Sequence, residues 1–463
     1  MDQQPAVIRV GELDFPARKV WMRTYGCQMN YHDSERILSH LGKLNFTATD
    51  KQEDADLVLF NTCAVRDLAN LKFYSHLGET SHIKKDVVIA AGGCIAQTEG
   101  KDLVKKYKQL DFAFGTDVID NIGEMVYRAY AGDRKFSVTT WDRSEDYSIE
   151  TKITHGTPQA FVNIIKGCDK FCSYCIVPFT RGREKSRRLE EVVKDVQRLV
   201  EFSGIQEVTL LGQNVNSYGK DNGESLAQLL GELQKIDGLE LIRYTTSHPY
   251  DVSDELVEAH ARLNKLANHL HLPVQSGSNT VLQRMLREYS SEHYLQLVAK
   301  MRAANPQMVI TTDIIAGFPN ETEEEHQETI KLLKAARFDF IYAYTYSPRK
   351  GTKSARMTDV LTDEIRSRRL QEIMDVQEEI QKEVRQQMEG RTYRMLVIEK
   401  GSYKGQTKWN GRTSCNRLVH FTPDETDVTD YLWRWVDVEI TSTTAFSCQA
   451  KFVRDHGKKL GHA

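Results

Sequence analysis

Hydrophobic runs alternate with amphipathic stretches along the first third of the chain. Short apolar runs at 19–25, 55–60 and 86–91 each have the length and composition of a buried strand, and helical periodicity follows at 33–41 and 67–77. Strands that alternate with helices are typical of a parallel sheet covered by helices on both faces. This segment therefore predicts a doubly wound α/β domain.

The same alternation continues between about residues 155 and 385. Helical patterns at 189–202, 253–266 and 322–336 separate further apolar runs. The expected strands are 161–165, 207–211, 241–246, 269–274, 308–315 and 340–346. These βα units predict a partial (β/α)6 barrel rather than a closed barrel of eight. A charged amphipathic helix at 362–388 is expected to lead out of this domain.

Near Gly390 the pattern changes again, to short β-like runs such as 393–399 and 433–440 with glycine turns between them. This pattern predicts a small antiparallel β-barrel. Between the first two segments, residues 131–157 are polar, charged and weakly periodic, so we interpret them as an interdomain connection. The predicted domains span residues 18–134, 154–385 and 386–452.

The composition agrees with several folded domains. The chain has 463 residues, of which 40% are hydrophobic and 27% are charged, as in soluble globular proteins. Its N-terminus, from Met1 to Pro5, lacks the basic and apolar regions of a secretory signal, and no apolar run approaches the ~18 residues of a membrane helix. We therefore expect a cytoplasmic protein without membrane contact. Structural disulfides are rare there, so the eight cysteines point to metal or redox chemistry.

The strongest chemical signal is a cysteine triplet directly after the first strand of the predicted barrel. Cys168, Cys172 and Cys175 have the spacing C-x3-C-x2-C. Structural zinc normally has four protein ligands, and no further Cys or His lies nearby in the sequence. Three thiolates suit a [4Fe–4S] cluster with one iron left open for a substrate or cofactor. A zinc knuckle completed by a distant residue is the alternative.

Three further cysteines lie in the first segment. Cys27, Cys63 and Cys94 each follow one of three successive expected strands, and they are 36 and 31 residues apart. The carboxyl ends of parallel strands meet at one edge of a sheet, so these thiols are expected to converge on a second cluster. The alternative is that they are three unrelated buried side chains. We interpret Cys415 and Cys448, in the β module, as ordinary thiols.

Two basic segments suggest a nucleic-acid substrate. The formal net charge of −3 excludes a uniformly basic binding protein, yet residues 391–420 carry seven Lys or Arg against one acidic residue. Tyr403 and Trp409 lie among these charges, as a surface that binds phosphates and stacks on bases would require. A second basic run, 181–188, follows the cysteine triplet. Together the two segments favour RNA as the substrate.

The cysteine triplet, with the aromatic Tyr174 before its last cysteine, resembles the radical S-adenosylmethionine (SAM) enzymes. This resemblance implies that the open iron binds SAM, that SAM is cleaved to a 5′-deoxyadenosyl radical, and that Tyr174 packs near the adenine.

The whole arrangement is similar to the methylthiotransferases, which join a cluster domain, a radical-SAM domain and a TRAM module. Their pattern is matched by Asn61–Cys63, Gly93–Cys94, Lys166–Arg183, Leu211–Gly219 and Tyr346–Thr352. Residues Gly411–Arg417 resemble the RNA-binding signature of TRAM. The segments Asp-Lys-Phe-Cys and Val-Pro-Phe-Thr-Arg-Gly favour the branch of this family that converts dimethylallyladenosine next to the tRNA anticodon into its 2-methylthio derivative.

The resemblance implies a reaction with two [4Fe–4S] clusters and two SAM molecules. One SAM methylates a sulfur on the auxiliary cluster of Cys27, Cys63 and Cys94, and the other yields the radical that removes hydrogen from carbon 2 of the adenine. An aromatic C–H bond offers no acidic proton, so cofactor radical chemistry is needed.

The family pattern and the expected strand ends together suggest the remaining site residues. Arg287 is expected to bind the SAM carboxylate, and Gly317, Phe318 and Pro319 to shape the adenine pocket. The other residues expected to contact SAM are Tyr174, Gln213, Ser247, Gln275 and Asp313. The residues expected to bind RNA are Lys408, Trp409, Arg412, Asn416 and Arg417.

The implied partners are a tRNA anticodon stem-loop, an electron donor such as flavodoxin or ferredoxin, and a system that supplies sulfur or clusters. Two other readings remain open at this point. The same chemistry could act on threonylcarbamoyladenosine tRNA or on a ribosomal-protein aspartate. A noncatalytic metal-containing RNA-binding protein is the other reading.

Overall fold

A computed structural model describes residues 8–10, 13–80, 86–141, 147, 149, 151, 157–403, 406–424 and 427–457. The chain divides into two compact units. The first unit comprises residues 1–154, 165–170 and 176–185, and the second comprises 155–164, 171–175 and 186–463. No helix within the described ranges combines the length and apolar character of a bilayer span.

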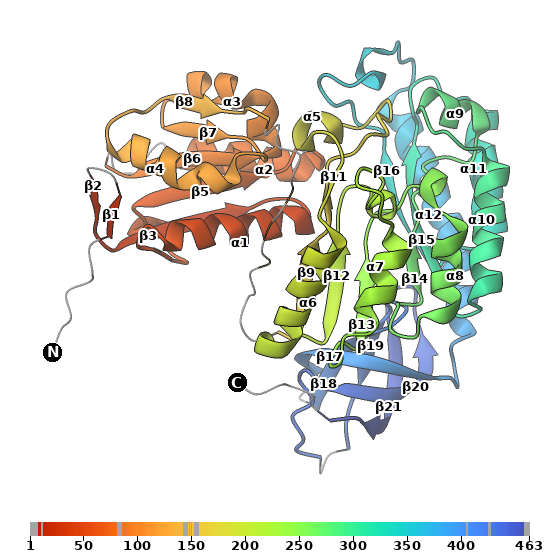
Figure 1. Ribbon diagram of the computed structural model, residues 1–463. Coiled ribbons are helices and arrows are strands. Elements are labelled where there is room, and N and C mark those ends of the chain that lie inside the picture. Colours follow the sequence, from red (N-terminus) through yellow and green to blue (C-terminus); the bar gives the residue numbers. More distant parts are fainter. Residues whose placement is uncertain are drawn as a thin grey trace. The chain divides into compact units, whose positions relative to one another are not determined.

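A six-stranded sheet organises the first unit (Figure 1). Its order is β4-β3-β5-β6-β7-β8, and every neighbouring pair is parallel. The strands are β3 (Arg18–Thr24), β4 (Phe46–Ala48), β5 (Leu57–Thr62), β6 (Val88–Gly93), β7 (Phe112–Phe114) and β8 (Phe136–Val138). A separate antiparallel hairpin pairs β1 (Ile8–Val10) with β2 (Leu13–Phe15). The predicted parallel α/β sheet is confirmed.

Two hydrophobic cores lie on opposite faces of this sheet. Strand β5 shows the division, because Leu57 and Leu59 belong to one core whereas Val58 and Phe60 belong to the other. Successive side chains of a strand point to opposite faces, so both faces are covered. The helices of this unit are α1 (Gln28–Gly42), α2 (Asp67–Glu79), α3 (Cys94–Lys106), α4 (Ile122–Tyr130) and α5 (Val177–Arg181).

Strand β8 corrects the interpretation of residues 131–157 as a connection. Phe136–Val138 pairs in parallel with β7 at the edge of the sheet, and Phe136 stacks on Phe112 with ring centroids 5.3 Å apart. The sheet therefore extends past the predicted domain end at residue 134. Much of the rest of that predicted connection (142–146, 148, 150 and 152–156) lies outside the described residues.

The second unit contains two three-stranded parallel sheets, ordered β9-β12-β13 and β14-β15-β16. These strands are β9 (Gln159–Asn163), β12 (Glu207–Leu211), β13 (Leu241–Tyr244), β14 (His269–His271), β15 (Val309–Ala316) and β16 (Phe340–Thr345). A backbone bridge between Ile242 and Leu266 and another between Gln275 and Ile314 extend the pairing. The predicted partial barrel of six βα units is confirmed.

Helices cover the outside of these strands (Figure 1). They are α6 (Leu189–Ser203), α7 (Leu226–Leu233), α8 (Asp254–Arg262), α9 (Asn279–Arg284), α10 (Ser291–Ala304) and α11 (Glu323–Ala336). Two short strands, β10 (Ile165–Lys166) and β11 (Lys185–Ser186), pair with each other. Helix α11 begins with a capping box between Thr322 and Glu325, which satisfies backbone N–H groups at its first turn.

Helix α12 (Asp363–Gln386) leads from the parallel sheets to a closed five-stranded barrel. The barrel strands are β17 (Thr392–Tyr403), β18 (Gln406–Thr413), β19 (Leu418–Phe421), β20 (Trp435–Thr443) and β21 (Cys448–Asp455). All but one of the neighbouring pairs are antiparallel, the exception being β19 with β21. This barrel agrees with the predicted β module, although β21 ends after residue 452.

Candidate functional site

The thiols of Cys27, Cys63 and Cys94 converge at the carboxyl edge of the first unit's sheet. Gly26 shows how closely the loops approach. A Cβ atom on Gly26 would lie 2.5 Å from the Cβ and 2.7 Å from the Sγ of Cys63. Gly26 also has φ +108°, a conformation that glycine adopts without steric cost. Glycine at this position therefore lets the loop that carries Cys27 pass against Cys63.

Two helices begin at this edge. Cys27 is the N-cap of α1, and Cys94 is the first residue of α3. Helix N-termini favour negative charge, so both positions suit thiolates. Burial raises the pKa of Cys63, and the neighbouring thiols of Cys94 and Cys27 raise it further. The three sulfurs thus interact electrostatically, as the ligands of one metal cluster would.

Hydrogen bonds around the three cysteines fix their loops. Asn30, which is buried, donates from Nδ2 to the carbonyl oxygens of Tyr25 and Thr62, at 2.9 Å and 2.8 Å. The hydroxyl of Thr62 donates to the Gly92 carbonyl at 2.6 Å and accepts from the Ile95 backbone N–H at 3.1 Å. The loops after three successive strands are therefore tied together. We name Cys27, Cys63 and Cys94 the auxiliary trio.

The second cysteine group is divided between the two units. In the first unit, the backbone N–H of Cys168 donates to the Gly182 carbonyl at 3.1 Å. Gly167 has φ +77°, and a Cβ there would lie 2.0 Å from the Arg183 carbonyl oxygen. Glycine is therefore needed next to Cys168, because the backbone of residues 182 and 183 passes against it.

In the second unit, Cys172 and Cys175 lie on a tight turn in which the Cys175 N–H donates to the Cys172 carbonyl at 3.0 Å. Ser173 anchors this turn. Its backbone N–H donates to the Met285 carbonyl at 2.9 Å, and its own carbonyl accepts from the Ser354 N–H at 2.8 Å. The turn is therefore held from two elements that are distant in sequence.

Arg287 is a buried charged side chain that contacts this turn. Its guanidinium donates to the Cys172 sulfur at 3.4 Å, to the Pro273 carbonyl at 2.7 Å and to the Tyr289 hydroxyl at 2.7 Å. Burial opposes its charge, but interactions with Tyr289, Tyr174 and Cys172 raise the pKa of Arg287 well above its usual value. A buried cation therefore contacts one of the expected cluster ligands.

The residues expected to contact SAM follow neighbouring strands. Gln213 comes after β12, Ser247 after β13 and Gln275 after β14. Ser247 donates its N–H to the His271 carbonyl at 3.3 Å, and Gln275 donates its own to the Asp313 carbonyl at 2.9 Å. Asp313 lies within β15, whereas these residues were expected at or just beyond the strand ends. Gln213, Ser247, Gln275 and Asp313 thus come from successive strands of the partial barrel.

Two observations indicate that these loops form part of a ligand site. Gln275 has φ +75°, which is unusual for a residue with a side chain, and strained backbone concentrates at functional sites. The Ser247 hydroxyl is buried and makes no hydrogen bond to any described part of the chain. A buried polar group of this kind calls for a ligand or water as its partner.

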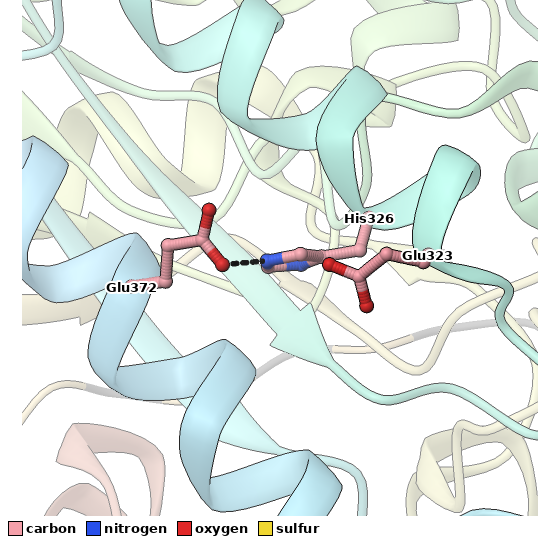
Figure 2. Close-up of side chains that lie close together, drawn as sticks. All are labelled: Glu323, His326 and Glu372. Carbon is pink, nitrogen blue, oxygen red and sulfur yellow. Dashed lines mark hydrogen bonds and ion pairs between the residues drawn. The ribbon is translucent and has the colours of Figure 1, made fainter.

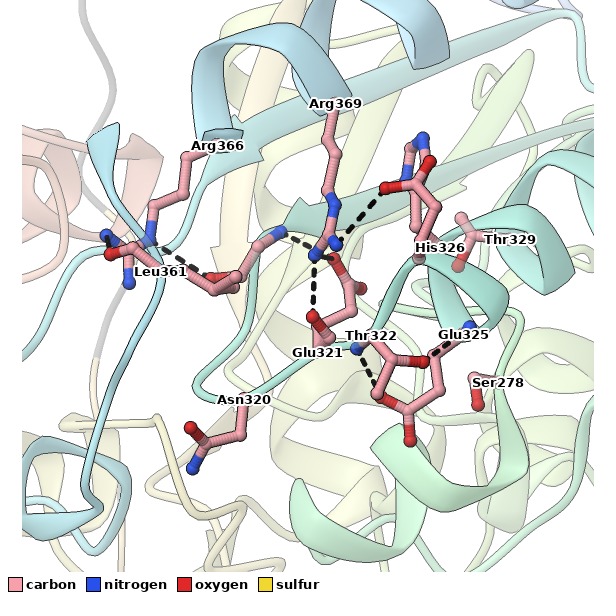
Figure 3. Close-up of polar contacts among 12 residues, drawn as sticks. Ser278, Asn320, Glu321, Thr322, Glu325, His326, Thr329, Leu361, Arg366 and Arg369 are labelled. Atoms are coloured by element: carbon pink, nitrogen blue, oxygen red, sulfur yellow. Dashed lines mark hydrogen bonds and ion pairs between the residues drawn. The ribbon is translucent and has the colours of Figure 1, made fainter. Parts of the chain in front are cut away.

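The loop from Gly317 to Glu321 is held by helix α12 (Figure 3). Glu321 pairs with Arg369 at 2.9 Å and accepts the Gly317 N–H at 3.0 Å, while Arg366 donates to the Gly317 carbonyl at 3.1 Å. Phe318, in the same loop, packs in a small core against which Tyr174 rests. The structure therefore brings Tyr174 and the loop of Gly317–Pro319 together.

One group of ligand-type side chains was not expected from the sequence. Glu323, His326 and Glu372 place a ligand atom each within 4.8 Å of one another, and Figure 2 shows His326 between the two carboxylates. His326 bonds Glu372 at 2.9 Å, and Glu323 pairs with Arg368 at 2.6 Å. Because an arginine already neutralises Glu323, we interpret this group as an ion-pair contact between α11 and α12.

The β-barrel corrects two of the expected RNA contacts. Trp409 is 1% exposed and lies in the barrel core, so its indole offers no free face on which a base could stack. Arg417 is 9% exposed, and its guanidinium is paired with Asp339, with an Nε–Oδ1 distance of 2.8 Å. Both side chains stabilise the second unit instead. Lys408, Arg412 and Asn416 are only partly buried.

Arginines of the second basic run, 181–188, form ion pairs within each unit. In the first unit, Arg181 is buried against Asp33 and Arg183 pairs with Asp169. In the second unit, Arg187 is buried and pairs with Asp195 at 3.1 Å. The RNA surface that the two basic runs together suggested therefore does not include the buried Arg181 and Arg187.

Comparisons with known families match both α/β regions. Residues 19–115 match the model described as "Uncharacterized protein family UPF0004", and residues 162–333 match that of the "Radical SAM superfamily". Among solved structures, a radical S-adenosylmethionine methyltransferase, TsrM, from Kitasatospora setae has a TM-score of 0.56 at 14% identity, covering 73% of this chain and 74% of that one. This likeness agrees with the radical-SAM fold.

Curated relatives match over nearly the whole chain. A tRNA-2-methylthio-N(6)-dimethylallyladenosine synthase from Carboxydothermus hydrogenoformans is 41% identical over 450 residues, which cover 94% of this chain and 99% of the relative. The enzyme of the same name from Bdellovibrio bacteriovorus is 41% identical over 428 residues, covering 92% and 93%. The chain therefore belongs to the family of the tRNA-2-methylthio-N(6)-dimethylallyladenosine synthases.

Proposed function

We propose that this protein adds a methylthio group to carbon 2 of dimethylallyladenosine next to the anticodon of tRNA. One observation carries the proposal: a chain of this family has two separate groups of three cysteines. One is the auxiliary trio at the sheet edge, and the other is the C-x3-C-x2-C loop of Cys168, Cys172 and Cys175. Similarity along the full length of the relatives supports the same reaction.

The residues of both sites fit [4Fe–4S] clusters. The auxiliary trio combines three interacting thiols with two helix N-termini and a close glycine, and Cys172 accepts a hydrogen bond from the buried Arg287. Three ligands per cluster would leave one iron without a protein ligand. When bound, such clusters offer an open coordination position and, together with SAM, the electron needed for chemistry at an aromatic C–H bond.

The chain's own residues would bind and orient SAM across the ends of the parallel strands, where folds of this class place their active sites. We propose that the buried Ser247 hydroxyl and the strained Gln275 contact SAM, together with Gln213 and Asp313. Tyr174, packed on the Phe318 core, would hold the adenine, and Arg287 would meet the carboxylate beside Cys172.

The barrel would hold the anticodon stem-loop of the tRNA. Lys408 and Arg412 are four positions apart on β18, on the side opposite the buried Trp409 and Gly411, so they face away from the barrel core. With Asn416 they form the part of the expected RNA surface that we retain. The further partners proposed are an electron donor such as flavodoxin or ferredoxin and a source of sulfur, in the cytoplasm.

Nucleoside analysis tests this proposal. Anaerobically reconstituted protein is incubated with SAM, a reductant and dimethylallylated tRNA, and the digested nucleosides are identified by mass spectrometry. We expect 2-methylthio-dimethylallyladenosine together with 5′-deoxyadenosine. If 5′-deoxyadenosine forms only with threonylcarbamoylated tRNA or a ribosomal protein, the substrate is wrong. If it forms under no condition, the enzyme assignment is wrong.

Two triple variants assign the sites. Changing Cys168, Cys172 and Cys175 to Ala should abolish 5′-deoxyadenosine formation. Changing the auxiliary trio to Ala should leave this cleavage but remove the methylthio product. Cys415→Ala is the matched control, because that thiol lies buried in the barrel region and is outside both groups.

A further inference from the structure

Arg181 is a buried cation beside the auxiliary trio, although it comes from the sequence that follows the second cysteine group. It is the last residue of α5, which packs on α3 in the first unit, and it is 8% exposed. Its guanidinium makes a 2.6 Å ion pair with Asp33, which is 2% exposed. A fully buried charge is expensive unless it is paired, so this contact has a structural or functional purpose.

The second contact of Arg181 leads directly to the cysteine loops. Its other terminal nitrogen donates to the Oδ1 of Asn30 at 2.9 Å. Asn30 in turn donates to the carbonyls of Tyr25 and Thr62, which lie two positions before Cys27 and one before Cys63. The Cys27 sulfur is 3.7 Å from the same Asn30 oxygen. Arg181 therefore orients the amide that joins two of the three loops.

The charge of Arg181 is coupled to the thiols themselves. Burial opposes protonation, but Asp33, Cys94 and Cys27 together raise the pKa of Arg181 well above its usual value. A [4Fe–4S] core of charge +2 held by three thiolates carries a net charge of about −1, and reduction by one electron makes it about −2. A fixed positive charge nearby stabilises the more negative state.

We propose that Arg181 is a positioning residue of the auxiliary site: it locks Asn30 against the loops of Cys27 and Cys63, and its charge sets the reduction potential there. Asp33 orients Arg181 and partly offsets its charge. This inference rests on the proposed function, because it assumes a cluster on the auxiliary trio. The proposal gives Arg181, in the segment Val-Pro-Phe-Thr-Arg-Gly, a role distinct from RNA binding.

The test uses full-length protein in which Cys168, Cys172 and Cys175 are Ala, so that only the auxiliary trio can hold a cluster. The midpoint potential is measured by a redox titration followed by electron paramagnetic resonance, and iron loss is timed with a chelator. Arg181→Met should shift the midpoint to a more negative value and speed iron loss. Arg183→Met, an exposed arginine two residues away, is the matched control and should change neither.

Asp33→Asn separates charge from structural damage. Removing this negative charge should shift the midpoint to a more positive value, opposite to Arg181→Met. Arg181→Lys keeps the charge but not the two-pronged geometry, so it should restore the midpoint and only part of the iron retention. Equal midpoints in Arg181→Met and its parent, or shifts of the same sign in Arg181→Met and Asp33→Asn, would overturn the inference. A parent that holds no cluster would instead overturn the proposed function.

Discussion

Gly26 provides a direct test of how tightly the auxiliary trio is packed. In Gly26→Ala the new Cβ would lie 2.7 Å from the Cys63 sulfur, whereas ordinary contacts begin at 3.4 Å. The sulfur must therefore move by about 0.7 Å (3.4 − 2.7) or the backbone must shift. Metal–ligand distances tolerate only about 0.2 Å. The φ of +108° adds backbone strain of about 1–3 kcal/mol.

We expect Gly26→Ala to hold about four irons per chain after anaerobic reconstitution, against about eight in the parent, and still to release 5′-deoxyadenosine from SAM. Gly132→Ala is the matched control. Gly132 has φ +94° but no atom within 4 Å of the added Cβ, so it shares the strain without the clash. Should Gly26→Ala bind as much iron as Gly132→Ala, the close approach of the loops to Cys63 would be refuted.

Four further substitutions test the second unit. Arg417→Ala leaves Asp339 buried without this partner and should lower the free energy of unfolding, measured by urea titration, by about 3–5 kcal/mol. Trp409→Ala should lower it by a similar amount, because it leaves a cavity in the barrel core. Wild-type stability in either variant would contradict the burial of that side chain. Lys408→Ala should leave stability unchanged and weaken tRNA binding. It should also reduce by about one the slope of the logarithm of the binding constant against the logarithm of salt concentration, and an unchanged slope would remove Lys408 from the RNA surface. Burial lowers the pKa of His260 to about 4 in the folded protein, against about 6.5 in the unfolded chain. As the pH falls from about 6.5 to 4, the unfolded chain therefore binds this proton before the folded protein does, and the stability decreases. The loss between pH 7.5 and pH 5 should be about 2 kcal/mol smaller in His260→Gln, and an equal loss would refute this origin.

The convergence of the auxiliary trio could be predicted because it follows from topology. Parallel strands bring their carboxyl ends to one edge, so cysteines after three successive strands must meet there whatever the details of the loops. The structure adds what topology does not specify. The positive φ of Gly26 and the two helix N-termini at Cys27 and Cys94 explain why the thiols come close enough to interact.

Ion pairs between distant parts of the sequence could not be predicted. Arg181 and Arg417 belong to basic runs of the sequence. Each is nevertheless neutralised by a distant aspartate: Asp33 is 148 residues from Arg181, and Asp339 is 78 residues from Arg417. Local charge counting does not reveal such partners. The burial of Trp409 could have been inferred from the strand period, since it alternates on β18 with the polar Lys408 and Asn410.

The short edge strand β8 could not be predicted for a different reason. Phe136–Val138 is only three residues long and lies in a polar segment, so it has too few positions to show a strand period. What stabilises it is pairing with β7 and stacking of Phe136 on Phe112. These are tertiary contacts, and the strand propensity of the residues alone does not predict them.

Mössbauer spectroscopy of 57Fe-reconstituted, oxygen-free protein tests the central claim most directly. We expect spectra of two [4Fe–4S] clusters in the unaltered chain, and of one cluster each in the variants lacking either the auxiliary trio or Cys168, Cys172 and Cys175. The two single-cluster spectra should sum to that of the unaltered protein. A single cluster in the unaltered chain, or a cluster that survives only when all six cysteines are present, would contradict the account.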